Sequence, residues 1–120
     1  ASFPTYLLTH WTRDRTRGEK LSIPFVVSAQ CRRTAASVGL HDRGIIAPGY
    51  KADVNVIDYD RLRMSPPRVR HDLPEGGRRL VQDIIGYDAT IVSGTITVRG
   101  DQPTGARPGR LVRGVQEAPG

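Results

Sequence analysis

Cysteine and long apolar runs are scarce in this sequence, and each shortage excludes a class of protein. A single cysteine, Cys31, rules out an internal disulfide framework and suits a reducing compartment such as the cytoplasm. No apolar run approaches the roughly 18 residues typical of a membrane-spanning helix. The first residues lack a basic stretch followed by an apolar one, so they do not resemble a signal peptide. We expect a cytoplasmic chain that starts within a longer sequence, because Ala1 is not preceded by an initiator methionine.

Lysine is also rare, although positive charge is plentiful. The net charge is +6 and the isoelectric point is near 10.2, yet only Lys20 and Lys51 are lysines. A basic balance raises nucleic acid as a partner, because clustered cations gain affinity by displacing counterions from phosphates. The arginines here are scattered and many have acidic neighbours, as in Asp42-Arg43, so we expect no nucleic-acid role.

The 120 residues suffice for one domain with a modest core, and the first forty indicate two helices. Apolar residues at helical spacing predict a first helix over residues 4–17, which begins with Pro4 and ends at Gly18. In the second helix, Ser22 is placed as the N-cap and Gly39 as the closing residue.

The pattern changes after Leu40, where glycine and proline concentrate and alternation predicts short strands. The Pro48-Gly49 pair favours a type II turn, because proline fixes a negative φ and glycine accepts a positive one. Residues 59–77 show little periodicity and predict a long connection, and the tail over residues 102–120 is expected to wrap a partner surface or to be loose. The predicted strands are residues 51–58, 79–83, 87–92 and 95–99, the last two forming a hairpin around Ser93-Gly94.

Candidate catalytic residues are few and badly spaced. His10, His41 and His71 show neither His-x-His nor His-x-x-x-His spacing, so polar or surface roles are expected. Cys31, on the second predicted helix, is expected to be a small buried hydrophobe rather than a nucleophile. His71 and Asp72 have the composition of a catalytic pair, but adjacent residues of an extended chain point to opposite sides.

The glycine pair within residues 75–79 indicates a phosphate-binding loop only weakly, because no strand-loop-helix context accompanies it. An ordinary turn accounts for it equally well. The residues by themselves therefore predict a small α+β chain without a self-contained active site.

Residues 39–58 carry a longer pattern of glycines, apolar residues and an Ala-Asp pair. They fit Gly-x-x-x-x-Gly-x-Ile-x-x-Gly-x-x-Ala-Asp-h-x-h-h-Asp, where h is apolar. This segment resembles the one that leads out of the barrel of amidohydrolase-superfamily enzymes into their C-terminal β-sandwich. Residues 3–14, 71–80 and 104–114 are similar to signatures of the N-acyl-D-amino-acid deacylases (D-aminoacylases) of that superfamily. The resemblance covers nearly the whole chain.

The resemblance implies a C-terminal fragment of such an enzyme. Residues 1–40 would be the helical end of the TIM-like barrel, and residues 41–120 would be part of the C-terminal β-sandwich with an irregular tail. In this family, histidines of early strands and a bridging carboxylate or cysteine hold the metal, and an aspartate ends the last strand. All of these would precede Ala1, so no catalytic or metal-binding residue is carried over onto this chain. Phe3 and Pro4 are expected near the active-site mouth.

The implied parent enzyme is a zinc-dependent hydrolase of amide C–N bonds in N-acyl-D-amino acids. One or two zinc ions would lower the pKa of a bound water and polarise the acyl carbonyl, and the aspartate would pass the proton to the leaving amine. The expected partners are the remainder of the barrel and the small-molecule substrate, with no zinc on this chain and with possible self-association of the fragment. The alternatives are a freestanding interaction module and a basic nucleic-acid-binding protein.

Overall fold

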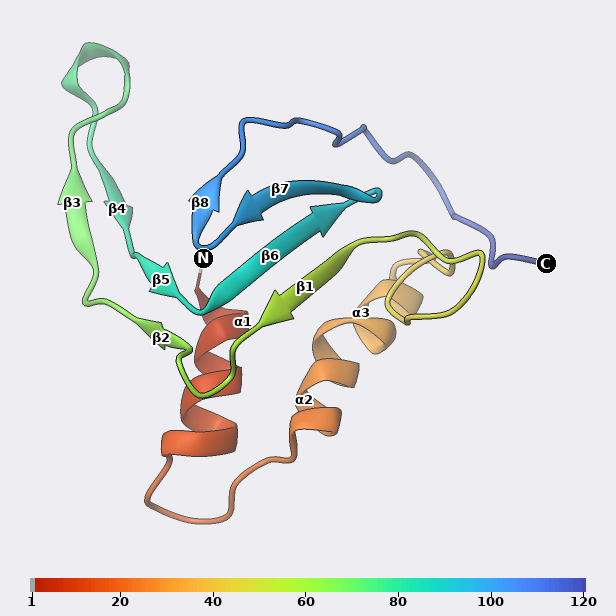
Figure 1. Cartoon of the computed structure of the whole chain (residues 1–120), viewed down its shortest axis with the longest axis horizontal. Helices are drawn as coiled ribbons and strands as arrows, with labels where there is room; N and C mark the ends of the chain where they lie inside the picture. The colour runs from red at the N-terminus through yellow and green to blue at the C-terminus, as the bar shows by residue number, and fades with distance from the viewer. Residues whose placement is uncertain (1) are drawn as a thin grey trace.

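The chain begins with one helix whose hydrogen-bonding pattern changes along its length. The computed structural model describes residues 2–120, and in it the α-helix α1 (Phe3–Tyr6) runs directly into the π-helix η1 (Leu7–Asp14) (Figure 1). Pro4 lies in the first turn as predicted, where its missing N–H removes no helical hydrogen bond. The helix ends at Asp14, because Arg15 is extended and its N–H bonds to the His10 carbonyl. The predicted end at residue 17 was therefore too late.

The second predicted helix is divided in two at Cys31. Ser22 caps α2 (Ile23–Gln30) as predicted, since its side chain accepts a hydrogen bond from the Phe25 N–H at 3.3 Å. Cys31, at φ −114° and ψ −84°, interrupts the helix before α3 (Arg32–Ser37). Gly39 closes α3 as predicted with φ +76°, and the N–H of the next residue, Leu40, bonds to the Ala35 carbonyl at 2.9 Å.

Four antiparallel strands form the main sheet, in the order β1-β6-β7-β8. The hairpin of β6 (Tyr87–Val92) and β7 (Thr95–Arg99) turns at Ser93-Gly94, as the sequence predicted. β1 (Val54–Ile57) is shorter than the predicted strand over residues 51–58, and its register shifts between Val56 and Ile57. β8 (Gln102–Pro103) adds a short edge.

Residues 59–77 were expected to be an irregular connection, but they form half of a projecting two-stranded arm. Antiparallel pairs join β2 (Arg63–Met64) to β5 (Ile84–Ile85) and β3 (Arg68–Arg70) to β4 (Arg79–Val81). A 3₁₀ turn, η2 (Pro74–Gly76), lies at its tip, and the arm extends away from the main sheet in Figure 1. β4 confirms part of the strand predicted over residues 79–83. The sequence did not predict β2, β3 or β5, because each is only two or three residues long and shows no alternation.

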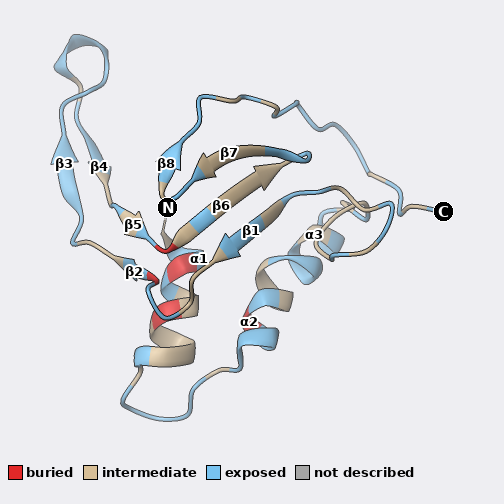
Figure 2. Cartoon of the chain, in the orientation of Figure 1, coloured by how far each residue is buried: buried red, intermediate tan, exposed pale blue. Residues whose placement is uncertain are grey.

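Few side chains among the described residues are buried. Among the described residues, Leu62 is 0% exposed and Val26 is 2% exposed, and two threonines of the first helix, Thr5 and Thr9, are also buried. Figure 2 shows most of this burial where the first helix meets the segment before β2 and the start of β6. At this point Gly86 lies so close to Leu62 that an added Cβ would stand 2.7 Å from the Leu62 Cα.

The molecule is more open than a compact domain of its size. Its accessible surface is 8823 Å², whereas a folded monomer of this mass exposes about 6,400 Å². Its radius of gyration is 16.3 Å, against about 14 Å for a compact domain of this length. Large apolar side chains such as Phe25, Ile46 and Leu80 remain exposed. Much apolar surface is therefore left open within residues 2–120.

None of the helices in residues 2–120 has the length and apolarity that crossing a bilayer requires. The tail was expected to be loose or to wrap a partner. Near its end the tail is held by its own chain, because Gln116 forms an isolated parallel bridge with Leu40. The last residues thus lie against the loop that follows α3.

Candidate functional site

The three histidines do not converge. His10 lies in η1, stacked on the Tyr6 ring at 4.9 Å between centroids and meeting Trp11 edge-on at 5.6 Å. His41 follows α3, and His71 follows β3 on the arm. Within residues 2–120, no three His, Cys, Asp or Glu side chains are grouped so that they could hold a metal ion. The residues described here do not fit a metal centre.

Cys31 is exposed, so the prediction of a small buried hydrophobe was wrong. The reason is the interruption between α2 and α3, which removes Cys31 from the helical periodicity on which that prediction relied. Its side chain lines an open hollow of about 420 Å³ together with Val38 and Gly44. No histidine lines that hollow, so a Cys-His nucleophile pair is not assembled there.

The structure gives Asp72 an arginine partner rather than a histidine. Both carboxylate oxygens of Asp72 accept hydrogen bonds from Arg79 across the base of the arm tip, at 2.7 and 2.8 Å. This hydrogen bonding lowers the pKa of Asp72 below its ordinary value. The glycine pair nearby forms the tip turn, in which the Gly77 N–H bonds to the Pro74 carbonyl. Both features are therefore parts of a hairpin end.

Phe3 and Pro4 lie exposed at the start of α1. On the opposite side of this helix, Thr5 is buried and its hydroxyl lies 2.8 Å from the phenol oxygen of Tyr87 in β6. One side of the helix is thus tied to the sheet, and the side carrying Phe3 faces outward. A place near an active-site mouth stays a prediction for Phe3 and Pro4.

The segment over residues 39–58 forms a joint between the helices and the sheet. Arg43 binds the Asp42 carboxylate through two hydrogen bonds of 2.7 and 3.0 Å, and another guanidinium nitrogen lies 3.6 Å from Asp53. This pairing lowers the pKa of Asp42 and raises that of Arg43. Asp53 in turn accepts a hydrogen bond from the Ser93 N–H at 2.8 Å, at the turn of the β6-β7 hairpin.

Two glycines of this joint allow close approaches. Gly44 has φ +89°, and a Cβ added to it would lie 2.8 Å from the backbone Cα of Arg32 at the start of α3. Gly49 has φ +82°, and the Tyr50 N–H bonds to the Ala47 carbonyl, which agrees with the predicted type II turn. The loop can therefore lie directly on α3 only because glycine stands at position 44.

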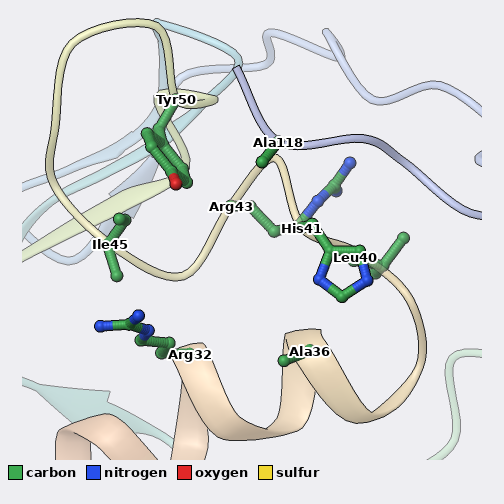
Figure 3. Close-up of a pocket in the computed structure, with 8 residues that line it drawn as sticks. All are labelled: Arg32, Ala36, Leu40, His41, Arg43, Ile45, Tyr50 and Ala118. Carbon is green, nitrogen blue, oxygen red and sulfur yellow. The ribbon is translucent and has the colours of Figure 1, made fainter. Parts of the chain in front are cut away.

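A small hollow opens between α3, this loop and the tail (Figure 3). Its volume is about 220 Å³, and the residues that line it are Arg32, Ala36, Leu40, His41, Arg43, Ile45, Tyr50 and Ala118. Ligand pockets usually measure about 300–1,000 Å³. The charge of Arg43 is already engaged by Asp42 and Asp53, and the lining contains no carboxylate or thiol. The hollow offers no catalytic pair and is a feature of the joint.

The family model described as "Amidohydrolase family" matches residues 1–98. This chain belongs to the amidohydrolase family. A search of curated proteins and a search of solved structures each found no match.

In this amidohydrolase chain, the matched range includes the first helix, the joint, the arm and most of the β6-β7 hairpin. Residues 39–58, which carry the superfamily pattern, have structural tasks here: Gly39 ends α3, Gly44 admits the loop, and Asp53 fixes the hairpin turn. Members of this family are often metal-dependent, but the described residues supply no ligand group. Within residues 2–120, the contacts of this segment are therefore structural ones between the helices and the sheet.

Two stabilising contacts of this amidohydrolase chain were missed from the sequence. Asp101 accepts hydrogen bonds from the N–H groups of Gly86 and Tyr87 at 2.9 and 2.7 Å, and it lies 3.6 Å from Arg61. The second is the Thr5–Tyr87 hydroxyl pair. The partners are 14 or more residues apart, so no local spacing rule connects them. The one local signal was the Gly100-Asp101 pair at the end of a strand, because glycine and aspartate are common in turns.

Proposed function

We propose that this chain is the C-terminal structural part of a zinc-dependent amidohydrolase that cleaves the amide C–N bond of N-acyl-D-amino acids. Membership of the amidohydrolase family supports the hydrolase class. The resemblance of residues 3–14, 71–80 and 104–114 to deacylase signatures supports the substrate class. The single observation that carries the structural role is the open surface of 8823 Å² on a chain with so few buried apolar side chains.

The first helix supports a place beside the last barrel strand. Two hydrogen bonds between hydroxyl groups hold its inner side. Thr5 bonds to Tyr87 at 2.8 Å, and Thr12 bonds to Tyr59 at 2.6 Å. Its outer side presents Phe3, 62% exposed, with Tyr6 one turn further on. A helix that is tied on one side and apolar on the other is suited to lie between two layers. On this proposal, residues 1–40 close the barrel, and Phe3 and Pro4 lie near the active-site mouth.

The main sheet supports membership of a composite β-sandwich over residues 41–120. Strands β1 and β8 have no outer neighbour within residues 2–120, so each leaves backbone N–H and C=O groups unpaired. Proteins normally cover or protect such edges, because exposed edges promote aggregation. Val56 on β1 is also exposed. Strands from the rest of the enzyme would pair with these edges and cover this face.

The metal ligands and the general base would come from the rest of the barrel. When zinc is bound there, it supplies a water of lowered pKa and a polarised carbonyl. The residues of this chain would contribute by holding the last strand and the sandwich in place. The partners in this proposal are the remainder of the barrel and the N-acyl amino acid.

The test compares this chain alone with the same chain joined to the preceding catalytic part. Both are assayed with zinc on N-acyl-D-amino acids and, as a control, on the N-acyl-L forms. We expect the isolated chain to show no turnover and the joined protein to prefer the D form. Turnover by the isolated chain would overturn the structural role, and a joined protein that cleaves neither form would overturn the substrate class.

A second measurement addresses the freestanding module that the sequence leaves as an alternative. We expect light scattering to show self-association of the isolated chain, because the outer side of the first helix is apolar. Substitution of Phe3 and Tyr6 by serine should reduce association, whereas Ile46→Ser, at a 90% exposed position in the loop after α3 and outside the first helix, should not. A monomer at all concentrations would instead favour a self-sufficient module.

A further inference from the structure

Residues 104–116, here called the strap, cross from the main sheet to the joint (Figure 1). At one end, the Thr104 N–H and hydroxyl bond to the carbonyls of Thr97 and Ile96 at 2.9 and 2.8 Å. At the other end, Gln116 exchanges backbone hydrogen bonds with Gly39 and His41, both at 2.9 Å. The strap is therefore held at both ends by its own chain.

Most backbone groups in the middle of the strap have no hydrogen-bond partner among residues 2–120. The exceptions are the Ala106 N–H, which bonds to the Thr104 hydroxyl, and the carbonyls of residues 113–115, which accept from the Gln116 side chain. Within the described part of the chain, residues 105–115 make no backbone-to-backbone hydrogen bond. Buried backbone groups are nearly always paired, so such a segment must face either water or a partner that pairs with it. An extended backbone with fixed ends has already lost part of the conformational entropy that binding would cost. This favours contact with a partner.

The strap has positive charge without acidic neighbours. Arg107, Arg110 and Arg113 are all exposed, and no Asp or Glu stands between Asp101 and Glu117. None of the three arginines forms an ion pair with any carboxylate of residues 2–120, whereas Arg43, Arg61, Arg68 and Arg79 each do. The three-residue spacing equals one turn of a polyproline II chain, in which such residues share one side.

Aliphatic side chains lie between and after the last two of these arginines. Leu111 is 78% exposed and Val115 is 61% exposed, and Val112 between them is exposed as well. Residues 101–120 contain no aromatic side chain. The segment therefore lacks the aromatic platforms on which single-stranded nucleic acids stack. A phosphate backbone would pair with the guanidinium groups but would leave the aliphatic side chains in water.

We propose that the strap is a docking surface for an acidic and partly aliphatic protein surface. Carboxylates of the partner pair with the three arginines, since guanidinium groups match carboxylates with two parallel hydrogen bonds. Apolar residues of the partner cover Leu111 and Val115. A second copy of the chain is a poor occupant, because its own net charge is +6. The inference goes beyond the proposed function, because the occupant is an acidic protein surface and not the amide substrate.

The experiment measures binding of the whole chain to a soluble random copolymer of glutamate and leucine, by fluorescence anisotropy. The strap variant is R107Q/R110Q/R113Q, and the matched control is R17Q/R70Q/R78Q, which removes three exposed arginines from other parts of the surface. Both variants lower the net charge equally. Because all six side chains are exposed, far-ultraviolet circular dichroism should be unchanged in both.

We expect the strap variant to bind the copolymer at least tenfold more weakly and the control less than twofold more weakly. Leu111→Ser should also weaken binding, by a few fold, without changing its salt dependence. An equal loss in both triple variants would overturn the proposal, because binding would then follow net charge alone. Tighter binding of the unaltered chain to a DNA duplex, or to vesicles of phosphatidylserine and phosphatidylcholine, would overturn it in favour of those partners.

Discussion

The carboxylate of Asp53 accepts a hydrogen bond of 2.8 Å from the backbone N–H of Ser93, across 40 residues of sequence. Asp53 belongs to the segment that carries the superfamily pattern, and Ser93 stands at the hairpin turn with φ +49°. This contact holds the turn of the β6-β7 hairpin against the strand entry of β1. Asp53 therefore has a structural role, which is to hold the hairpin turn, and this role does not depend on catalysis.

Asp53→Ala should destabilise the chain because the Ser93 N–H loses its acceptor and Arg43 loses one of its two carboxylates. The expected loss is about 1 kcal/mol, since the site is partly open to water. Asp53→Asn keeps an acceptor oxygen and should cost less. Urea unfolding followed by circular dichroism measures both. Equal midpoints for the two variants would show that the hydrogen bond to Ser93 contributes nothing.

Gly44→Ala should be more harmful than the same change at Gly94. Both glycines have positive φ, +89° and +79°, so each alanine suffers the same backbone strain of about 1–2 kcal/mol. At position 44 the new methyl group also meets the Arg32 backbone, whereas at position 94 nothing lies within 4 Å. We expect an additional loss of about 1–3 kcal/mol for Gly44→Ala, measured by chemical unfolding. A smaller loss at 44 than at 94 would contradict the close approach of the loop to α3.

Acid should weaken the joint through Asp42. Its pKa is lowered chiefly by the hydrogen bonds from Arg43, so the folded chain binds this proton more weakly than the unfolded chain does. The contribution is therefore complete above the unfolded pKa of about 4 and is lost as the pH falls below it. Urea midpoints at pH 6 and pH 3 should differ less for Asp42→Asn than for the unaltered chain. Asp72→Asn, which breaks the exposed pair with Arg79, is the comparison for a carboxylate outside the joint.

The Thr5–Tyr87 hydroxyl pair permits a double-mutant cycle. Tyr87→Phe leaves the buried Thr5 hydroxyl without this partner, which should cost about 1–3 kcal/mol. Thr5→Val should cost a similar amount. The double variant should cost clearly less than the two single losses together, because neither hydroxyl is then left unpaired. Additive losses would mean that the first helix is not held to β6 by this bond.

The parts of the fold that the sequence predicted well depend on neighbouring residues. Ser22 caps a helix because its hydroxyl reaches an N–H three residues away, and Gly39 ends one because it accepts a positive φ. The β6-β7 hairpin is equally local, since strand alternation and the Ser93-Gly94 turn lie in one stretch of 13 residues, 87–99. These features follow from chain geometry within a few residues.

The parts that the sequence predicted badly depend on distant partners. β3 forms because it pairs with β4 across the arm, and the sequence of residues 59–77 has no periodicity that predicts a strand. Cys31 is exposed because the helix divides there, although helical spacing placed it inside. The tail has almost no local preference, and its position is set by Gln116 meeting Gly39 and His41.

By itself, the sequence determined the α+β composition, the helix caps, the hairpin and the resemblance to amidohydrolases. Each of these features depends on residue types at short or fixed spacing, because sterics and local hydrogen bonds determine the local backbone conformation. Only the tertiary structure decided that the superfamily segment is a joint built on Arg43 and Asp53, and that the arginines of the strap form no ion pair with residues 2–120. These facts depend on which distant groups come within hydrogen-bonding range, and that is settled when the whole chain packs.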